Sequence, residues 1–273
     1  MTKKCNLLDK GFLQVIDLMG DDQAIVDSAR VSYAKGTKKT RNNAGLISFL
    51  LEHDHMTPFE MVELKVLVKA PIFVARQWFR HRIGSFNEES ARYSKVENDY
   101  YMPTNWRGQS TTNKQCSNDD IINSPDIDYN YKEGCDTQFT SYEYAIEQGV
   151  SREQARMMLP LSTYTTFVWK VNGRSLMNFI KLRNDKHAQY EIRVYAEALN
   201  SVFKEWLPLT YDAFDNHVLN AVKFSRDEMN VLRLMLNKKS VIEYQDGSLV
   251  WEKPMQFSDT QWQRFLNKFK PTC

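Results

Sequence analysis

A strand pattern that runs directly into a helix pattern constrains this chain more than any other feature. Residues 62–69 (VELKVLVK) mostly alternate apolar and polar side chains, which is typical of a strand with one buried face. Pro71 follows, and proline is favoured in the first turn of a helix. We therefore predict a helix over residues 71–82 (PIFVARQWFRHR). Its inner side carries Ile72, Ala75, Trp78 and Phe79.

A second strand is predicted from residue type. Residues 163–171 are β-branched and aromatic, which favours a strand, and the dipeptide Asn172-Gly173 is a turn signal at its end. Ser175 is then placed to cap a helix.

Further helices follow from apolar spacing and from capping signals. We predict them over residues 44–54, near 137–148 up to Gly149, over about 188–206 and from Ser225 onward. Two capping-box patterns, Thr57 to Glu60 and Ser151 to Gln154, predict short helices. The first has at most one turn, and the second ends before Pro160.

Composition excludes several classes of protein. The 273 residues correspond to one or two domains, and 42% hydrophobic with 26% charged residues is ordinary for a globular chain. A net charge of +2 means that an anionic ligand must be held by a local cluster. The sequence has no run of 18 apolar residues and no signal-peptide start, so we expect a cytoplasmic protein without membrane contact.

Cysteines and glycines narrow the chemistry further. Cys5, Cys116, Cys135 and Cys273 are scattered and form no CxxC motif, so we expect reduced thiols and no bound metal. No glycine-rich phosphate loop or GxGxxG motif occurs, which leaves a P-loop or Rossmann site unsupported.

Two segments stand apart from this organisation. Residues 104–136 are rich in Asn, Asp, Ser and Thr and show no period, so we predict a long surface insertion there. The tail after about residue 220 carries only the helix pattern that starts near Ser225.

The densest polar stretch runs from Gln77 to Tyr93 (QWFRHRIGSFNEESARY). The arginines of Arg80-His81-Arg82 offer planar forks suited to phosphate, and at the end of a helix the three side chains cannot all point to one place. Ser90 and Arg92, two apart in an extended segment, would face the same way and hold one phosphate. A basic helix end followed by a polar loop is the alternative, but the added density of polar groups favours a ligand site.

This stretch resembles the signature of flavin-dependent thymidylate synthases, in which RHR is followed after seven residues by serine. Arg80-His81-Arg82, IGSFNEE and Ser90 reproduce that spacing. Other segments look like blocks of the same family in the same order: HDHMTPFE, KAPIFVARQWFRHR, NEESARYS, REQARMMLPL and NGRSLMNFIKLR-x3-HAQ. Together they cover about residues 10–100 and 137–215, and the insertion and the tail look peculiar to this chain.

The resemblance implies an enzyme that methylates dUMP to dTMP. Methylenetetrahydrofolate would give the carbon, reduced FAD the hydride, and NADPH would restore the flavin. It also implies an α+β fold with a mixed or antiparallel sheet flanked by helices, assembled as a homotetramer with shared active sites. Residues 1–220 would then be the catalytic domain, and residues 221–273 an extension of unknown role.

The resemblance also assigns site residues. The dUMP positions would be Gln77, Arg80, Glu88, Glu89, Ser90, Ala91, Arg92, Arg156 and Arg183. The FAD positions would be His55, Thr57, Glu60, Arg80, His81, Arg82, Ile83, Glu88, Asn172, Arg174 and Asn178. Ala91 departs from members that have glycine there. His187, one turn after Arg183 if the helix continues, could line the same cleft.

Arg183 is the candidate catalytic residue. A guanidinium beside the pyrimidine stabilises negative charge that develops on the ring and makes C5 a better nucleophile. No cysteine lies in a matching block, so no thiolate mechanism is expected, and Ser90 lacks a base and is expected to bind phosphate.

Two rival functions remain open. A nucleic-acid-binding module would use the arginines, yet Glu60, Glu63, Glu88, Glu89 and Glu97 lie among them in the sequence. An FAD enzyme of the same fold with another pyrimidine-nucleotide reaction is the second alternative.

Overall fold

The computed structural model describes residues 4–32, 42–111, 113–114, 116–236, 241–243, 249–251 and 258–269. The chain divides into two compact units, Met1–Leu219 and Asn220–Cys273. Each unit has its own apolar cluster, so each is described by itself.

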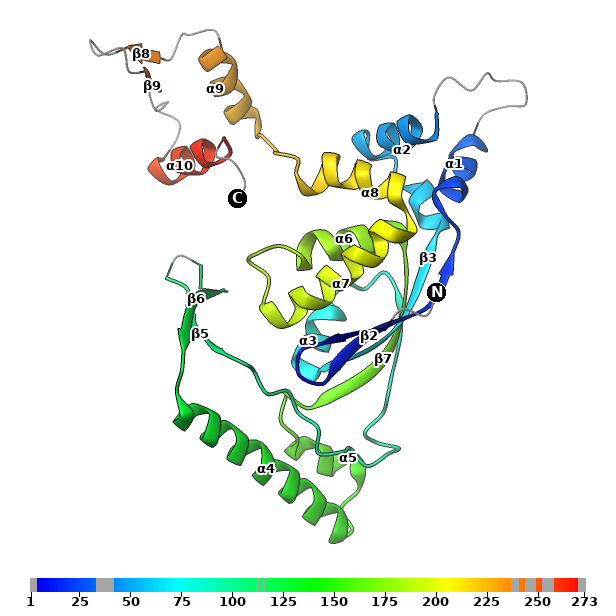
Figure 1. Ribbon diagram of the computed structural model, residues 1–273, viewed down its shortest axis with the longest axis vertical. Coiled ribbons are helices and arrows are strands. Elements are labelled where there is room, and N and C mark those ends of the chain that lie inside the picture. Colours follow the sequence, from blue (N-terminus) through cyan, green and yellow to red (C-terminus); the bar gives the residue numbers. More distant parts are fainter. Residues whose placement is uncertain are drawn as a thin grey trace. The chain divides into compact units, whose positions relative to one another are not determined.

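The first unit is built on a five-stranded sheet (Figure 1). Its strands lie in the order β1 (Lys4–Leu7), β2 (Gly11–Met19), β3 (Glu63–Pro71), β7 (Tyr164–Asn172) and β4 (Ser85–Glu88). Every neighbouring pair is antiparallel. The predicted α+β fold with an antiparallel sheet is therefore confirmed, and so are the strands at β3 and β7. The β1–β2 hairpin was not predicted.

The central pair, β3 and β7, sets the register of the sheet. Pro71 pairs with Tyr164 at one end, and Glu63 pairs with Asn172 at the other. Along β3 the side chains alternate between buried and half-buried. The alternation seen in the sequence therefore marks the face that the helices cover.

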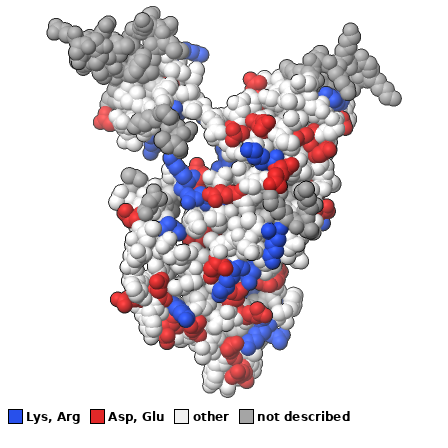
Figure 2. Space-filling model, viewed as in Figure 1, with Lys and Arg blue, Asp and Glu red and all other residues white. Residues whose placement is uncertain are grey.

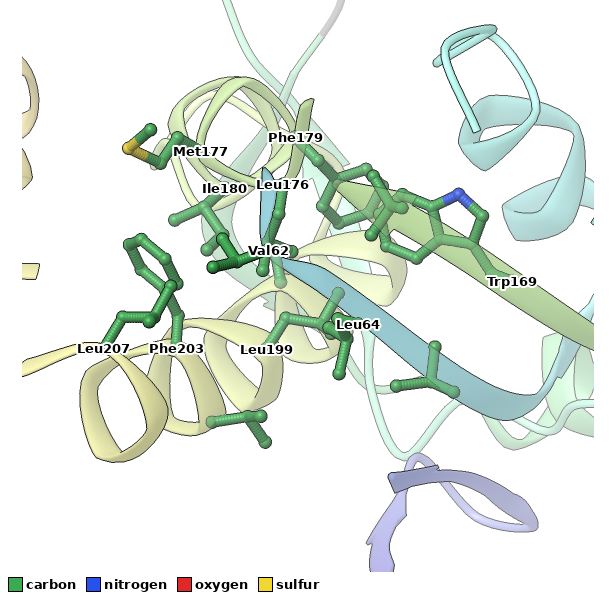
Figure 3. Packing of buried hydrophobic residues seen from close by; sticks show 14 of the residues in the cluster. Val62, Leu64, Trp169, Leu176, Met177, Phe179, Ile180, Leu199, Phe203 and Leu207 are labelled. Atoms are coloured by element: carbon green, nitrogen blue, oxygen red, sulfur yellow. The ribbon is translucent and has the colours of Figure 1, made fainter. Parts of the chain in front are cut away.

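Three helices pack on that face: α3 (Ile72–Trp78), α6 (Gly173–Arg183) and α7 (Tyr190–Trp206). Figure 3 shows Phe179 of α6 beside Trp169, and Leu199 and Phe203 of α7 on the same side of β3. Trp78 is fully buried, with its ring centroid 4.7 Å from that of Phe179 and 5.3 Å from that of Trp169. Such aromatic packing contributes about 0.5–1.5 kcal/mol per pair beyond burial alone.

The remaining helices of the first unit surround this core. They are α1 (Asp22–Arg30), α2 (Asn43–Glu52), the 3₁₀ segment η1 (Thr57–Met61), α4 (Pro125–Glu147), α5 (Arg152–Ala155), the 3₁₀ turn η2 (Arg156–Met158), α8 (Pro208–Phe214) and the π-helix η3 (Asp215–Leu219). The helices predicted over 44–54 and 188–206 correspond to α2 and α7 and are confirmed.

The prediction for α3 is wrong at its end. The helix stops at Trp78 rather than at residue 82, because the His81 N–H bonds to the Trp78 carbonyl and closes a turn. The chain must reverse here so that β4 can begin at Ser85 beside β7.

The segment 104–136 is also more ordered than predicted. It contains a hairpin of β5 (Trp106–Gln109) and β6 (Ser117–Ile122), and α4 already begins at Pro125. Ser124 caps α4 by accepting the Ile127 N–H, a serine-proline start signal that the lack of an apolar period obscured.

Three capping assignments are wrong. Asn172 is not a hairpin turn but the N-cap of α6, where its side chain accepts the N–H of Ser175. Ser175 therefore lies inside the helix. Neither predicted capping box forms, because no side chain caps η1 or α5.

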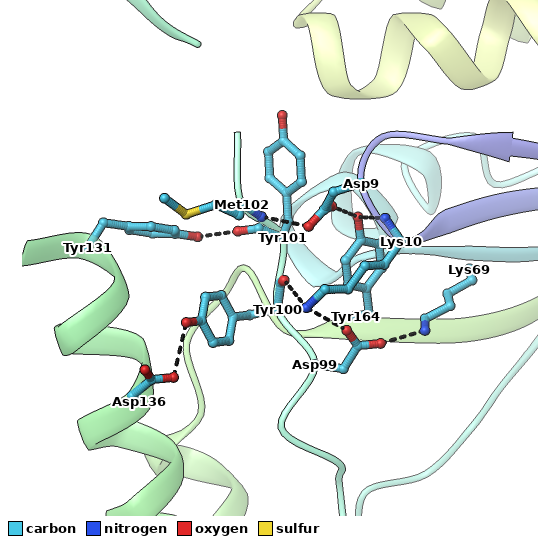
Figure 4. A network of polar contacts seen from close by, with 10 residues as sticks. All are labelled: Asp9, Lys10, Lys69, Asp99, Tyr100, Tyr101, Met102, Tyr131, Asp136 and Tyr164. Atoms are coloured by element: carbon cyan, nitrogen blue, oxygen red, sulfur yellow. Dashed lines mark hydrogen bonds and ion pairs between the residues drawn. The ribbon is translucent and has the colours of Figure 1, made fainter. Parts of the chain in front are cut away.

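Polar contacts fasten the start of segment 99–136 to the end of the sheet (Figure 4). The Asp99 carboxylate pairs with Lys69 of β3 and with Lys10, 3.1 Å away. Tyr131 of α4 donates its hydroxyl hydrogen to the Tyr101 carbonyl at 2.7 Å. These bonds hold α4 and its connection beside the sheet.

The second unit contains α9 (Arg226–Leu236), α10 (Asp259–Asn267) and a pair of short strands, β8 (Val241–Glu243) and β9 (Leu249–Trp251). The helix predicted from Ser225 is confirmed as α9. Val231, Trp262 and Phe265 form its buried cluster. In neither unit do the described residues include a helix long and apolar enough to cross a membrane.

The N-terminus of α8 has an unusual cap that gives a stability prediction. No local side chain caps it; instead Asp22 of α1 accepts the N–H of Leu209 at 2.8 Å and the N–H and hydroxyl of Thr210. Asp22→Ala should lower the free energy of unfolding by about 1.5–3 kcal/mol, since three bonds to one carboxylate are lost.

The loss corresponds to a fall of about 3–12 °C in Tm for a unit of this size, measured by thermal unfolding. Asp212→Ala, on an exposed position of α8, is the control and should change Tm little. Equal shifts in the two variants would contradict the capping role.

Candidate active site

The sequence-predicted flavin residues gather mainly in one cleft of about 630 Å³, here called the arginine cleft. Its basic lining residues are Arg80, Arg82, Arg174, Lys181 and Arg183, and its acidic one is Asp54. Apolar side chains of Leu51, Met56, Met177, Leu182, Phe214 and Val218 form much of the remaining wall. The cleft therefore combines donors for an anion with a surface for a flat ring system.

Two short segments supply most of these donors. The turn after α3 brings Arg80, His81, Arg82 and Ile83 into the cleft, and α6 brings Arg174, Ser175 and Asn178. We expected that Arg80-His81-Arg82 could not all point to one place. The premise of that expectation is wrong, because α3 ends before Arg80 and the three residues are released from helical spacing; all three line the cleft.

A hydrogen bond joins Arg183 and His81, which both line the arginine cleft. Arg183 Nε donates to His81 Nε2 at 3.0 Å, and its Nη2 donates to the Gln77 carbonyl at 3.4 Å. An imidazole nitrogen that accepts this bond carries no proton, so His81 is neutral. Burial, and secondly the charge of Arg183, lower the pKa of His81 to about 4.

Five of the predicted dUMP residues line a second cleft of about 720 Å³, here called the serine cleft. Glu88, Glu89, Ser90, Ala91 and Arg156 line it. Glu88 accepts the hydroxyl hydrogen of Thr165 at 2.7 Å, and Glu89 accepts the N–H of Thr166 at 2.9 Å. Burial raises the pKa of Glu89 despite that backbone bond.

The expected alignment of Ser90 and Arg92 is wrong. The chain does not stay extended after β4 but turns, with the Tyr93 N–H bonded to the Ser90 carbonyl at 3.0 Å. Arg92 does not line the serine cleft, and its Nη2 lies 3.5 Å from Glu153 in an exposed ion pair.

The two clefts share no lining residue. Arg80 and Arg183 therefore do not meet Ser90 and Arg156 within the serine cleft, although all four were predicted to bind one nucleotide. Glu88, predicted for both ligands, lines only the serine cleft.

Several predicted flavin residues lie outside the lining of the arginine cleft. His55 packs edge-on against Phe49, with 5.9 Å between ring centroids. Thr57 begins η1, and Asn172 caps α6. Glu60 reaches the cleft indirectly, since its carboxylate holds Arg174 at 2.7 Å.

His187 and the cysteines also lie apart from the arginine cleft. His187 Nδ1 is 2.8 Å from Asp185, and neither His187 nor any described cysteine lines that cleft. Cys5 is exposed, Cys116 half-buried and Cys135 buried, and all three are free thiols. Cys273 lies outside the described residues. Among the residues that can be described, no three His, Cys, Asp or Glu side chains are grouped to hold a metal.

Sequence reasoning missed functional candidates in both clefts. Lys69 and Asp99 line the serine cleft; Lys69 could have been found, because it is the last polar position of the alternating strand. Lys181 follows Asn178 and Arg174 at helical spacing on α6, which is a readable signal. Phe214 and Val218 reach the arginine cleft only through the packing of α8 and η3, and no local pattern reveals that.

The neutral state of His81 gives a pH prediction. The unfolded chain binds a proton on this histidine below about pH 6.5, whereas the folded chain resists it down to about pH 4. The free energy of unfolding should therefore be unaffected by His81 above pH 6.5 and should fall as the pH drops from 6.5 to 4.

The check is to compare denaturant unfolding of the natural chain and His81→Gln across this range; the variant should show the shallower fall. Arg183→Ala should raise the His81 pKa, as followed by NMR of the imidazole. A titration of His81 centred near pH 6.5 in the natural chain would contradict the assignment.

Comparisons with known proteins agree on one family. A family profile described as "Thymidylate synthase complementing protein" matches residues 14–209. A protein of Wolbachia pipientis wMel named "Flavin-dependent thymidylate synthase" is 45% identical over 261 residues, which is 93% of this chain and 92% of the relative. A protein of the same name from Thermus thermophilus is 47% identical over 230 residues, covering 84% and 85% of the two chains.

The Wolbachia match corrects the expectation that the tail, residues 221–273, is peculiar to this chain. A match that leaves 7% of the chain uncovered must include most of residues 221–273, which are 53 of the 273. Most of the tail is therefore shared with that relative.

A solved structure agrees with the sequence matches. The UMP/dUMP methylase PolB of Streptomyces cacaoi, bound to 5-Br dUMP, is 31% identical, with a TM-score of 0.67 over 78% of this chain and 97% of the methylase. Fold, motif spacing and sequence identity over most of the chain thus lead to one conclusion: the chain belongs to the flavin-dependent thymidylate synthase family.

Proposed function

We propose that this enzyme methylates dUMP to dTMP, with methylenetetrahydrofolate as carbon donor and NADPH as the source of reducing equivalents through FAD. The observation that carries the proposal is the hydrogen bond from Arg183 to a neutral His81 inside a cleft lined by five basic side chains. Family membership supports the reaction, and the geometry below supports the roles of the residues.

The arginine cleft fits FAD by the chemistry of its donors. Arg80, Arg82 and Arg174 supply the charge that a pyrophosphate needs, and Asn178 offers an amide to ribose or adenine. The wall that contains Met177 and Phe214 suits a flat ring. When bound, the flavin would supply the hydride.

Arg183 would act on the pyrimidine. Its guanidinium is held by His81 and by the Gln77 carbonyl, so it is oriented before substrate arrives. Burial lowers the pKa of Arg183, yet an arginine remains charged at neutral pH. A fixed cation beside uracil stabilises the charge that builds up when C5 attacks. No cysteine thiolate is needed for this route.

The serine cleft would bind the phosphate of dUMP. Ser90 supplies a hydroxyl, Ala91 a backbone N–H and Arg156 a guanidinium. Arg92 would join them only after leaving its exposed pair with Glu153, which is a weak contact.

The separation of the two clefts favours a shared active site. A nucleotide whose base lies at Arg183 and whose phosphate lies at Ser90 needs both clefts, and the two have no lining residue in common. We therefore propose that a second copy of the chain completes each site, in a homotetramer.

Neither rival is favoured for this chain over dUMP methylation. Acidic groups lie among the basic ones on the face seen in Figure 2, which is unlike a nucleic-acid-binding tract. A related reaction on UMP is the alternative that an observation supports, since the Streptomyces cacaoi protein is described as a UMP/dUMP methylase.

Tritium release tests the reaction directly. The purified protein should release tritium from [5-³H]dUMP only when FAD, NADPH and methylenetetrahydrofolate are all present. The same assay with [5-³H]UMP separates the two substrates, and a variant without cysteines should keep its turnover. A colourless protein that takes up no FAD would overturn the proposal.

The roles of Arg183 and Arg156 can be separated kinetically. Arg183→Ala should lower kcat by about 10²–10³-fold, because a preorganised charge is lost from the transition state. Arg156→Ala should instead raise KM for dUMP, by the loss of about 1.5–3 kcal/mol from a charge-assisted contact.

Both variants should still bind FAD and reduce it with NADPH, which controls for folding. Arg183→Lys should rescue poorly, since lysine lacks the planar fork. Normal turnover of Arg183→Ala at high dUMP would show that the residue only binds.

Subunit complementation tests the shared site. Arg183→Ala and Arg156→Ala damage different clefts, so a mixed oligomer contains some sites in which both clefts are natural. Co-expressed variants carrying different affinity tags, assayed at a dUMP concentration too low to fill Arg156→Ala sites, should recover up to about a quarter of the natural turnover if they assemble at random. Doubly tagged oligomers that stay inactive would contradict the sharing of sites.

A further inference from the structure

An ion pair between a half-buried arginine and a buried carboxylate joins the β5–β6 hairpin to the first turn of α7. Arg107 of β5 places its Nη2 2.6 Å from Glu191 Oε1. The Glu191 side chain is only 4% exposed, and that of Arg107 is 26% exposed. The hairpin lies in the segment for which the sequence revealed no role, so this contact is the strongest indication of what the segment does.

Arg107 is fixed from several sides. Its Nε donates to Ser117 Oγ of β6 at 3.1 Å, and its guanidinium lies 4.9 Å from the ring centroid of Tyr190. Tyr101 adds a hydroxyl bond to the same Glu191 oxygen at 3.3 Å. The pair is therefore a defined joint between the hairpin and α7, and not a mobile surface contact.

The joint lies a few residues from Arg183. Residues 184–189 connect the end of α6 to the start of α7, and Gln189 is the residue just before α7. The Gln77 side chain donates to Gln189, and the Gln77 carbonyl accepts from Arg183. The hairpin touches the connection a second time, where Cys116 donates its thiol hydrogen to the His187 carbonyl at 3.1 Å.

We infer that Arg107 is a positioning residue for the Gln77–Arg183 pair, acting through Glu191 and the first turn of α7. The inference rests on the proposed function, in which Arg183 acts on the pyrimidine while the Gln77 carbonyl holds its guanidinium. Arg107 itself touches no reacting atom.

The energetics of burial favour positioning over simple stabilisation. An ion pair with a buried carboxylate contributes little net stability, because Glu191 loses its water and the half-buried Arg107 loses part of its own. Glu191 Oε2 is buried and has no hydrogen-bond partner in the part of the chain that the structure describes, which adds a further cost. What the pair does provide is one fixed geometry. The Arg107 guanidinium is planar and is held by Glu191, Ser117 and the Tyr190 ring, so its side chain can adopt few other conformations.

The test uses the full-length enzyme with FAD bound. Arg107→Gln should lower kcat for tritium release, by up to about 10²-fold, because a misplaced catalytic group is that costly. KM for dUMP should change less than threefold, since the phosphate residues lie in the other cleft. Arg226→Gln is the matched control and should behave as the natural enzyme: that arginine is 89% exposed and pairs with its chain neighbour Asp227.

A structural readout accompanies the kinetics. Amide hydrogen exchange over residues 184–190 should speed up at least tenfold in Arg107→Gln and stay unchanged in the control. Arg107→Lys keeps the charge but cannot make all three contacts, so it should fall between the two; it also serves if Arg107→Gln does not fold. Glu191→Gln and the double variant should lose kcat by the same factor as Arg107→Gln, as expected for residues that act as one unit.

Three outcomes would overturn the inference that Arg107 positions Gln77 and Arg183. It is wrong if Arg107→Gln and Arg107→Lys keep natural kcat, if they lose FAD and turnover together in proportion to a lower Tm, or if exchange over residues 184–190 is unchanged. A failure of the proposed function is distinguishable from these, because the natural enzyme would then release no tritium from dUMP.

Discussion

The antiparallel pairing of β3 and β7 is the constraint on which the rest of the site depends. Each strand runs directly into a helix, and the register places those helix starts at opposite ends of the pair. The helices α3 and α6 fold back over the same face and are about 10 Å and 16 Å long, against about 30 Å for a nine-residue strand. Their carboxyl ends therefore meet near the middle of the sheet.

This meeting explains a cluster of cations without a glycine-rich loop. The last carbonyl groups of a helix carry partial negative charge and favour arginine nearby. Arg80 and Arg82 follow the end of α3, and Arg183 ends α6. A neutral His81 lies between them and accepts a hydrogen bond from Arg183. The repulsion between these positive side chains is thus offset by the partial negative charge of the helix ends and by a His81 imidazole that stays unprotonated.

Much of this frame could be predicted from sequence, because its elements are periodic. The alternation of residues 62–69 gave β3, the β-branched run gave β7, and helical spacing gave α2 and α7. The end of α3 was missed because the chain reverses there to pair β4 with β7, which is a tertiary contact. The hairpin β1–β2 was missed because no clear apolar period marks its strands in the sequence. The helix predicted near 137–148 was too short, because most positions of α4 (Pro125–Glu147) are exposed and polar and only one side carries buried residues.

The site was predictable by residue and not by arrangement. The RHR motif and Ser90 pointed to ligand binding, and the family resemblance supplied Arg156 and Arg183. A single sequence does not state which residues share a cleft. The residues predicted to bind one nucleotide are therefore found divided between two clefts. Ser90 and Arg92 failed as a pair because a turn replaced the extended segment on which their alignment depended.

The meeting of two helix ends makes helical phase a part of the active site. One extra residue inside α6 would move its last residue by about 1.5 Å and rotate it by about 100° about the helix axis. Arg183 would then point away from His81 even though every side chain of the site were still present. The number of residues between Asn172 and Arg183 therefore matters to this site as much as the identity of the arginine.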